Sequence, residues 1–235
     1  MKKRFIFAPL AIGIYALYRR AKKRDLPYTS ASASNLSKVG LSSGVVEQLP
    51  KWGYYAGGKP MEWMNLIIVG DEEKLVRVLE DSGWYKGDPI TPWVLVKAFF
   101  ALVFHAQYLT GPFTPIFVGD KQQRLSYQKP TPLNQFEQRH HARFWPTNLA
   151  DNSGKTIWIA HASYDKGIKQ TSPLSPPVHE IDERIDDERK VIVKDMVMGG
   201  AKLRGYIQFQ PPGEGTNAYG DKFVSDGRAA VLEVF

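Results

Sequence analysis

The sequence predicts an α+β domain, in which a mixed β-sheet packs with a few helices. Short apolar runs that end in glycine, proline or aspartate indicate strands, and Leu66–Val69 followed by Gly70–Asp71 is the first of them. Residues 72–82 place Leu75, Val78 and Leu79 on one helical face, which indicates an amphipathic helix. The chain shows no internal repeat, so a solenoid or propeller is not expected.

The remaining elements follow along the chain. Asp151–Gly154 supplies turn residues between two long alternating segments, so we expect a β-hairpin there. A charged helix should have an apolar stripe formed by Ile181, Ile185, Ile192 and Met196. The expected strands are 66–69, 116–118, 125–128, 138–145, 156–163, 206–210 and 229–234, and the expected helices are 72–82, 92–109 and 182–196.

The segment 92–109 is the most apolar of the expected helices. Only Lys97, His105 and Gln107 interrupt its run of hydrophobic residues. A helix that is apolar on nearly all sides is buried or lies against lipid. Burial is the favoured interpretation here, with partial membrane contact close behind.

The N-terminal segment carries the basic character of the chain. Residues 1–24 contain eight Lys or Arg and no acid, which leaves 23 basic and 24 acidic residues elsewhere in a chain of net charge +7. The run 5–18 has no charge, but 14 residues is short for a membrane-spanning helix. We expect an uncleaved anchor or interfacial segment at 1–24, with a signal peptide or a buried helix as alternatives. Residues 25–64 then form a tether and entry arm, and 65–235 form the domain.

Composition excludes several classes of function. The chain has no cysteine, so disulfides, thiolate metal sites and a cysteine nucleophile are ruled out. The positive charge lies in the N-terminus rather than on a domain face, which argues against nucleic acid as a partner. Standard phosphate-binding loops, the dinucleotide fingerprint and the serine-hydrolase elbow are also missing from the sequence.

The densest group of polar residues is the segment 139–145. In a strand, Arg139, His141, Arg143 and Trp145 share one face, and His140 lies on the other. Two guanidiniums that flank an imidazole suit the binding of an anion, and His141 is a candidate general acid or base. The alternative is a solvated face whose arginines pair with carboxylates of the charged helix.

A second polar group begins at His179. At helical spacing, Asp182, Asp186 and Arg189 fall on one face. His179, Asp182 and Asp186, together with His141 or His140, could bind a divalent metal through nitrogen and oxygen. Alternatively, Asp182 is only a helix cap and Asp186 pairs with Arg189.

Two residues of the expected strand 156–163 and its end are assigned structural roles. His161 alternates with Ile157 and Ile159, so it faces the core as a hydrogen-bonded histidine. Asp165 follows the expected strand end and is predicted to be a turn residue.

Six segments together resemble the LssY C-terminal domain family. They are NLIIVG at Asn65, SGW at Ser82, RHHARFW at Arg139, IWIAHASYDKGI at Ile157, HEIDERIDDER at His179 and GDKFVSDGR at Gly220. The resemblance runs from about residue 65 to the end of the sequence. Its most specific parts are RHHxRxW and HxIDxxxDxER, in this order.

The resemblance implies a membrane-associated protein of the bacterial cell envelope, on an unspecified side of the membrane. Members are described as components of type I secretion, and the domain often follows membrane segments of the DedA or lipid-phosphatase type. It brings no established reaction, and this chain lacks the multi-span segments. The residues singled out by the matching motifs are Arg139, His140, His141, Arg143, Trp145, His179, Asp182, Asp186, Glu188 and Arg189.

Two functional hypotheses follow from these residues. The first is a hydrolase of a phosphate-bearing or lipid-linked substrate. In it, Arg139 and Arg143 hold the anion, His141 transfers the proton, and the His179 group orients a base or binds a divalent metal. The second is a non-catalytic accessory domain that binds an anionic headgroup or a membrane-protein partner.

Overall fold

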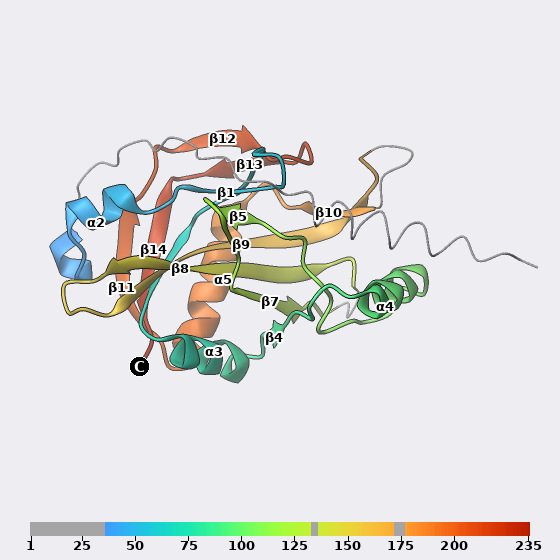
Figure 1. The fold of residues 1–235 in the computed structure, drawn as a ribbon, viewed down its shortest axis with the longest axis horizontal. Coiled ribbons are helices and arrows are strands. Elements are labelled where there is room, and N and C mark those ends of the chain that lie inside the picture. Colours follow the sequence, from blue (N-terminus) through green and yellow to red (C-terminus); the bar gives the residue numbers. More distant parts are fainter. Residues whose placement is uncertain (1–35, 133–135, 172–176) are drawn as a thin grey trace, which may run out of the picture.

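A mixed, eight-stranded β-sheet forms the centre of the molecule (Figure 1). The structure is a computed structural model that describes residues 36–132, 136–171 and 177–235. β14 and β3 are parallel, and every other pair in the sheet is antiparallel. The predicted α+β class is therefore confirmed. The strand order is β11 (Lys202–Gln208), β14 (Arg228–Glu233), β3 (Leu66–Val69), β9 (Thr156–Lys169), β8 (Arg139–Ala150), β7 (Leu125–Pro130) and β4 (Tyr85–Lys86), with β10 (Val178–Ile181) paired to the far part of β9.

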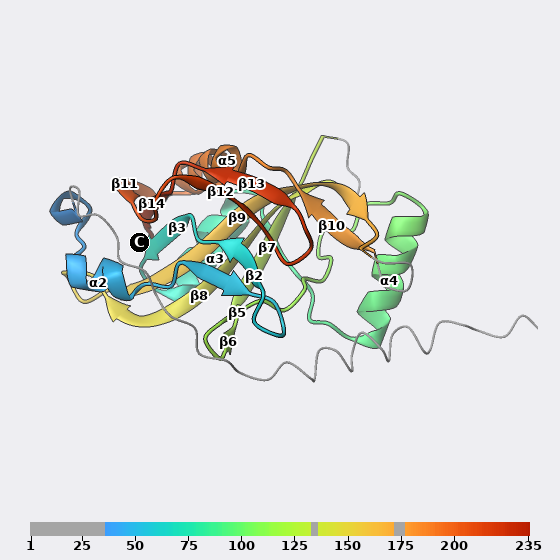
Figure 2. The ribbon, with the colours of Figure 1, turned by 90° about the horizontal axis from the view of Figure 1, so that it is seen from above.

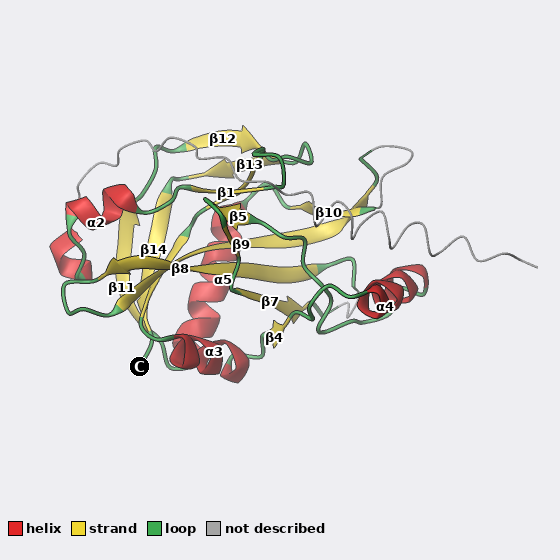
Figure 3. Cartoon of the chain, in the orientation of Figure 1, coloured by secondary structure: helices red, strands yellow, loops and turns green. Residues whose placement is uncertain are grey.

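Two smaller sheets and five helical segments complete the described fold. The four-stranded sheet has the order β2 (Pro60–Trp63), β1 (Trp52–Tyr54), β5 (Phe117–Val118) and β6 (Lys121–Gln122), and β12 (Gly213–Thr216) pairs with β13 (Lys222–Ser225). The helical segments are η1 (Leu36–Val39), α2 (Ser43–Gln48), α3 (Glu72–Asp81), α4 (Pro92–Val103) and α5 (Ile185–Met198), drawn red in Figure 3.

The central sheet is covered on both faces, and the side chains of β3 pack alternately against the two covering layers. Its Leu66 and Ile68 pack with residues of α3 and α5, whereas Ile67 and Val69 pack with residues of η1, α2 and β2. This is the period-two alternation of a strand, and it explains the uninterrupted apolar run in the sequence. The sheet thus lies between a helical layer and a layer of short elements (Figure 2).

The layer of short elements includes residues that we assigned to an entry arm. Val39, Leu41, Val46 and Leu49 are buried with Met64 in the second core cluster. The packed structure therefore includes residues of the expected entry arm as well as residues of the expected domain. The expected anchor at 1–24 lies outside the described residues.

The two helices of the helical layer follow the sequence pattern closely. α3 ends at Asp81 and is closed by Gly83, whose φ of 78° suits a residue without a side chain. α5 begins at Ile185 rather than at residue 182, with Arg184 in the capping position. The apolar stripe of α5 is buried as expected, and Ile192 and Met196 contact the sheet cluster.

The predicted burial of the apolar helix is wrong. α4 spans Pro92–Val103, and only Val94 and Ala101 among its residues are buried. Trp93 is 66% exposed, and Phe104, which directly follows the helix, is 69% exposed. Figure 1 shows α4 at the end of the molecule opposite α2, away from α3 and α5. Of the helices in the described part of the chain, none combines the length and hydropathy needed to cross a membrane.

Candidate functional site

Polar residues replace apolar ones along a single face of the β8–β9 hairpin. The cross-strand pair Trp145–Ile159 belongs to the apolar core. The next pairs on the same face are Arg143–His161, His141–Ser163 and Arg139–Asp165. All six side chains are buried, so the hairpin carries a closed polar cluster into the interior. The alternation predicted for Arg139, His141 and Arg143 is confirmed.

Elements beyond the hairpin close this cluster. Glu62 of β2 faces the hairpin, and its carboxylate accepts a hydrogen bond from Arg143 Nη1. The Phe113 ring lies 4.8 Å from the Arg139 guanidinium carbon and 5.1 Å from that of Arg143. Phe136 meets the His179 ring edge to face. Aromatic rings therefore separate the cluster from solvent on this side.

Asp165 is the anionic centre of the cluster. Arg139 Nε donates to its Oδ2 at 2.9 Å, and His179 Nδ1 lies 3.3 Å from the same oxygen. His141 Nδ1 lies 2.9 Å from Asp165 Oδ1, although the approach is too oblique for a regular hydrogen bond. The prediction that Asp165 is a turn residue is wrong, because β9 continues to Lys169.

The contacts of His141 determine where its proton lies. Its Nε2 is 3.2 Å from Arg143 Nη1, and a guanidinium can only donate. Nε2 is therefore the acceptor, and the proton is on Nδ1, facing Asp165. The Ser163 Oγ lies 2.9 Å from the same Nε2. A serine hydroxyl, an imidazole and a carboxylate thus form a continuous series.

The same reasoning applies to His161. Its Nδ1 is 2.7 Å from the backbone carbonyl oxygen of Trp63, which can only accept. The proton is on Nδ1, and the Nε2 lone pair faces the cluster. His141 and His161 therefore carry the proton on the same ring nitrogen, Nδ1.

Burial disfavours the protonated forms of His141, His161 and His179. It lowers the pKa of His161 to about 4 and that of His179 to about 3, and it also lowers the pKa of His141. Burial by itself raises the pKa of Asp165, but His141, His179 and Arg139 together hold that pKa well below its usual range. The pKa of Glu62 is raised by burial, against the opposing effect of Arg143.

Several polar atoms of the cluster have no hydrogen-bond partner among the described residues. They include Glu62 Oε2 and Arg143 Nε. Buried polar atoms in native proteins are nearly always paired, and clustered exceptions point to a bound water, ion or ligand. The cluster therefore has unused donors and acceptors with which to bind a further group.

One set of residues has the composition of a metal site. A ligand atom from each of Glu62, His141 and His161 lies within 4.8 Å of the other two. Two imidazole nitrogens and a carboxylate are a common zinc-binding set, and acceptors that orient the far ring nitrogens usually accompany it. Arg143 contacts both Glu62 and His141, so a cation there would compete with its guanidinium.

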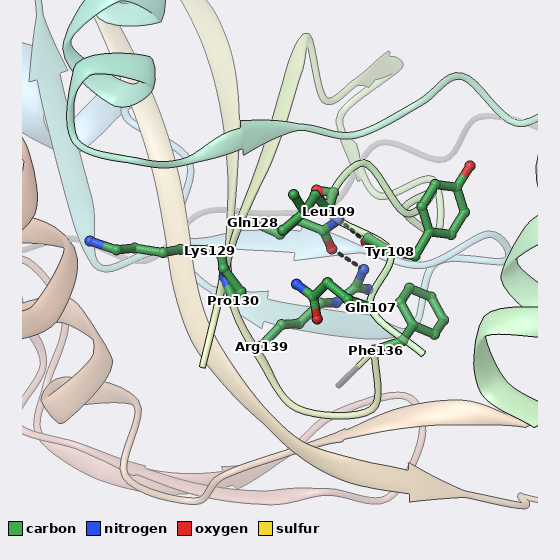
Figure 4. Close-up of a pocket in the computed structure, with 8 residues that line it drawn as sticks. All are labelled: Gln107, Tyr108, Leu109, Gln128, Lys129, Pro130, Phe136 and Arg139. Carbon is green, nitrogen blue, oxygen red and sulfur yellow. Dashed lines mark hydrogen bonds between the residues drawn. The ribbon is translucent and has the colours of Figure 1, made fainter. Parts of the chain in front are cut away.

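A small cavity adjoins the cluster at Arg139 (Figure 4). It has room for about one water molecule. Arg139 Nη1 donates to Gln128 Oε1 there, and Gln128 Nε2 donates to the carbonyl oxygen of Tyr108 at 2.9 Å. Phe136 also lines the cavity. The cavity therefore brings a small space into contact with Arg139, a member of the cluster.

Other predicted site residues lie elsewhere. His140 faces the helical layer, where its Nδ1 lies 2.8 Å from Glu188 Oε2 of α5. Burial raises the pKa of Glu188, and His140 opposes that shift. Trp145 is part of the apolar core. Neither His140 nor Trp145 joins Arg139, His141 and Arg143.

The expected metal group of His179, Asp182 and Asp186 does not form. His179 joins Asp165, while Asp182 accepts from the backbone N–H of Arg184. Asp186 belongs to a separate network around Arg189. Asp182 precedes α5 and is not its capping residue, because the helix begins later than the spacing indicated.

Arg189 is a fully buried cation with a structural set of partners. Its Nη1 donates to Asp186 Oδ1 and Asp226 Oδ1, both at 2.9 Å, and to the carbonyl oxygen of Arg228. Its Nη2 donates to Asp226 Oδ2 at 2.9 Å. These bonds tie α5 to the loop before β14. The alternative interpretation of Asp186 and Arg189 as an ion pair is confirmed.

Comparison with known proteins identifies the family. A family model described as LssY C-terminus matches residues 46–229, which is more than three quarters of the chain. The chain belongs to the LssY C-terminus family. No curated protein and no solved structure matches it. The family resemblance drawn from the six sequence segments is therefore confirmed.

The segment matched by the LssY C-terminus model contains residues that we did not single out from sequence. Glu62 lies in a four-residue strand between turn signals, and nothing local relates it to Arg143. Ser163 and Asp165 alternate with His161, and this period-two pattern could have indicated a shared face. We ended the strand too early because Asp165 and Gly167 resemble the start of a turn.

Proposed function

We propose that this chain hydrolyses phosphate-bearing esters, with Ser163 as nucleophile and His141 as general base. The observation that carries the proposal is the series Ser163–His141–Asp165, in which His141 Nε2 lies 2.9 Å from the hydroxyl oxygen and His141 Nδ1 lies 2.9 Å from a carboxylate oxygen. This arrangement of roles activates serine in unrelated hydrolases. It places the general base at the residue predicted from sequence, but with Asp165 as its orienting group.

The residues support a balanced two-step reaction. The Ser163 oxygen attacks phosphorus while its proton passes to His141 Nε2, and the bond from phosphorus to the leaving oxygen breaks. The leaving oxygen takes the proton from His141. Water then cleaves the phosphoserine by the same proton transfer, which releases phosphate and restores Ser163. Asp165 stabilises the imidazolium in both steps.

Arg143 supports an anionic substrate. Its Nη1 lies 3.2 Å from His141 Nε2, so its positive charge is beside the reacting atoms. In a buried site such a charge stabilises developing negative charge more strongly than it does in water. Arg139 is committed to Asp165 and Gln128, so its role is to position Asp165. For a substrate to reach Ser163, the covering ring of Phe113 or Phe136 must turn aside.

A fluorophosphonate probe tests this proposal directly, since it labels activated serines. We expect labelling of the purified chain and slow release of p-nitrophenol from p-nitrophenyl phosphate. Ser163→Ala should abolish both, because it removes one oxygen and leaves the packing almost unchanged. Ser126→Ala, on the neighbouring strand β7, is the matched control and should be fully active. Undiminished turnover by Ser163→Ala would refute the assignment of Ser163 as the nucleophile.

A second candidate uses the same cluster with a metal. Glu62 Oε2 lacks a hydrogen-bond partner among the described residues. The bond that orients the His161 ring joins Nδ1 to a backbone oxygen, so it does not use the lone pair on Nε2. With the Arg143 guanidinium turned away, Glu62, His141 and His161 could hold a divalent cation. Such an ion would lower the pKa of a bound water and make it the nucleophile.

Elemental analysis separates the two candidates. The chain is purified without chelator and its metal content is compared with those of Glu62→Gln and His161→Ala. A stoichiometric metal that both variants lose, together with active Ser163→Ala, establishes the second candidate. A metal-free chain whose activity depends on Ser163 establishes the first. His140→Ala, on the opposite face of β8, is a control that should change neither property.

A further inference from the structure

The exposed face of α4 is the strongest unpartnered apolar feature of the described structure. Trp93, Phe100 and Val103 are all at least 49% exposed, and Phe104 directly after the helix is 69% exposed. The rings of Phe100 and Phe104 stack at 6.0 Å, so the aromatic surface is continuous there. Residues 93, 100 and 104 recur at a spacing that places them along one side of a helix. Contiguous exposed apolar surfaces mark sites of interaction.

The charge around this surface points to one kind of partner. α4 contains a single ionisable residue, Lys97, which is exposed, and it contains no acid. Residues 1–24 add eight cations without an acid, on either side of the uncharged run 5–18. Exposed apolar residues and cations in one chain complement the surface of an anionic bilayer, whose headgroups attract the cations while the rings enter the interface.

We propose that α4 docks on an anionic lipid surface, with Trp93, Phe100 and Phe104 in the interfacial layer. α4 stands at one end of the molecule, so a planar surface can reach it without meeting the central sheet (Figures 1 and 2). One apolar segment binds a bilayer only weakly, and a second signal makes attachment stable. The run 5–18 is available to supply that second signal.

The docked orientation bears on the polar cluster. The chain leaves α4 through Gln107, Tyr108 and Leu109, which line the cavity beside Arg139 (Figure 4). A lipid surface at α4 would therefore lie close in sequence to the residues that line the cavity beside Arg139. The docking itself does not depend on the proposed hydrolase activity, and it would favour phosphate groups that are carried by lipids.

Tryptophan fluorescence reports on α4 itself. The chain has six tryptophans, of which Trp84, Trp145 and Trp158 are buried and Trp52 and Trp63 are partly buried. Trp93 is the one that is largely exposed. Vesicles of phosphatidylcholine and phosphatidylglycerol should shift the emission of the full-length chain to the blue, and brominated phosphatidylcholine should quench it. Trp93→Phe should remove both changes.

Vesicle affinity gives the second measurement. Phe100→Ser with Phe104→Ser should weaken co-sedimentation about a hundredfold, because burial of each ring contributes about a tenfold gain. Met198→Ser with Val224→Ser replaces similarly exposed apolar residues elsewhere and should leave affinity unchanged. Binding without any quenching of Trp93 overturns the proposal. A dimer that the phenylalanine variant dissociates, with vesicle binding unchanged, also overturns it and assigns α4 to a second copy.

Discussion

Substitution of the buried cation Arg189 distinguishes a structural role of this residue from a role in ligand binding. Its guanidinium has four hydrogen bonds within the chain, to Asp186, Asp226 and the carbonyl oxygen of Arg228. Loss of one partner of a buried ion pair costs about 3–5 kcal/mol when the other charge is left without compensation. Substitution of Arg189 by methionine retains much of its volume and removes the charge.

The loss of stability in Arg189→Met should lie at the lower end of that range. Asp186 would still accept from the Ser225 hydroxyl and the Asp226 backbone N–H, and Asp226 would still accept from Arg228. We therefore expect Arg189→Met to lower the free energy of unfolding by about 3 kcal/mol. Urea unfolding followed by tryptophan fluorescence measures this quantity.

Arg228 provides the matched control. It contacts the same Asp226, but its side chain is half exposed, so Arg228→Met should cost less than about 1 kcal/mol. Both variants should keep the metal content, probe labelling and vesicle binding of the parent chain. A loss of labelling with no loss of stability in Arg189→Met would show that Arg189 belongs to a binding site, against the structural reasoning.

Two further predictions concern stability. Arg204 Nη1 donates to Asp151 Oδ2 and its Nε to Glu233 Oε2. The pKa of Asp151 falls to about 2 because bonds from Lys155, Ser153 and Arg204 outweigh the effect of burial, and the Arg204 bond lowers that of Glu233 to about 2. Because both pKa values are depressed in the folded state, this stability is present above pH 4.5 and is lost as pH falls through 2. Arg204→Met should therefore flatten the fall in urea stability between pH 5 and pH 3, and an unchanged slope would contradict the assignment. Gly70 has a φ of 138°, and an added Cβ would lie 2.7 Å from the Val234 carbonyl oxygen. Gly70→Ala should lower the unfolding free energy by roughly 1–3 kcal/mol, measured by thermal melting. Gly154→Ala, where nothing lies within 4 Å of an added Cβ, should cost less; an equal loss in the two variants would refute the steric argument.

Local patterns predicted the parts of the fold that depend on local physics. Leu66–Val69 forms a strand with the expected bounds, because an apolar run before Gly70 has few other stable conformations. Alternation in 139–145 predicted correctly which residues share a face. The presence of a β8–β9 hairpin also followed from turn residues at Asp151–Gly154.

The composition of the cluster depends on contacts that local patterns do not contain. Glu62 meets Arg143 across 81 positions of sequence, and Arg189 meets Asp226 across 37. The spacing of Asp182, Asp186 and Arg189 suggested one helical face, but Asp182 precedes α5. His179, which we grouped with them as a metal ligand, lies on β10. The exposure of α4 could not be predicted either, because an apolar run does not show whether other elements of the fold pack against it.

The position of β14 has a consequence for how the molecule is made. This strand lies between β11 and β3, and it pairs in parallel with residues that precede it by more than 160 positions. The chain must therefore be synthesised at least as far as Glu233 before β14 can pair with β3, and such long-range pairing folds slowly. Until then the apolar edge of β3 is open to other chains. A premature stop before Arg228 would leave that edge open permanently, with aggregation rather than a smaller native domain as the outcome.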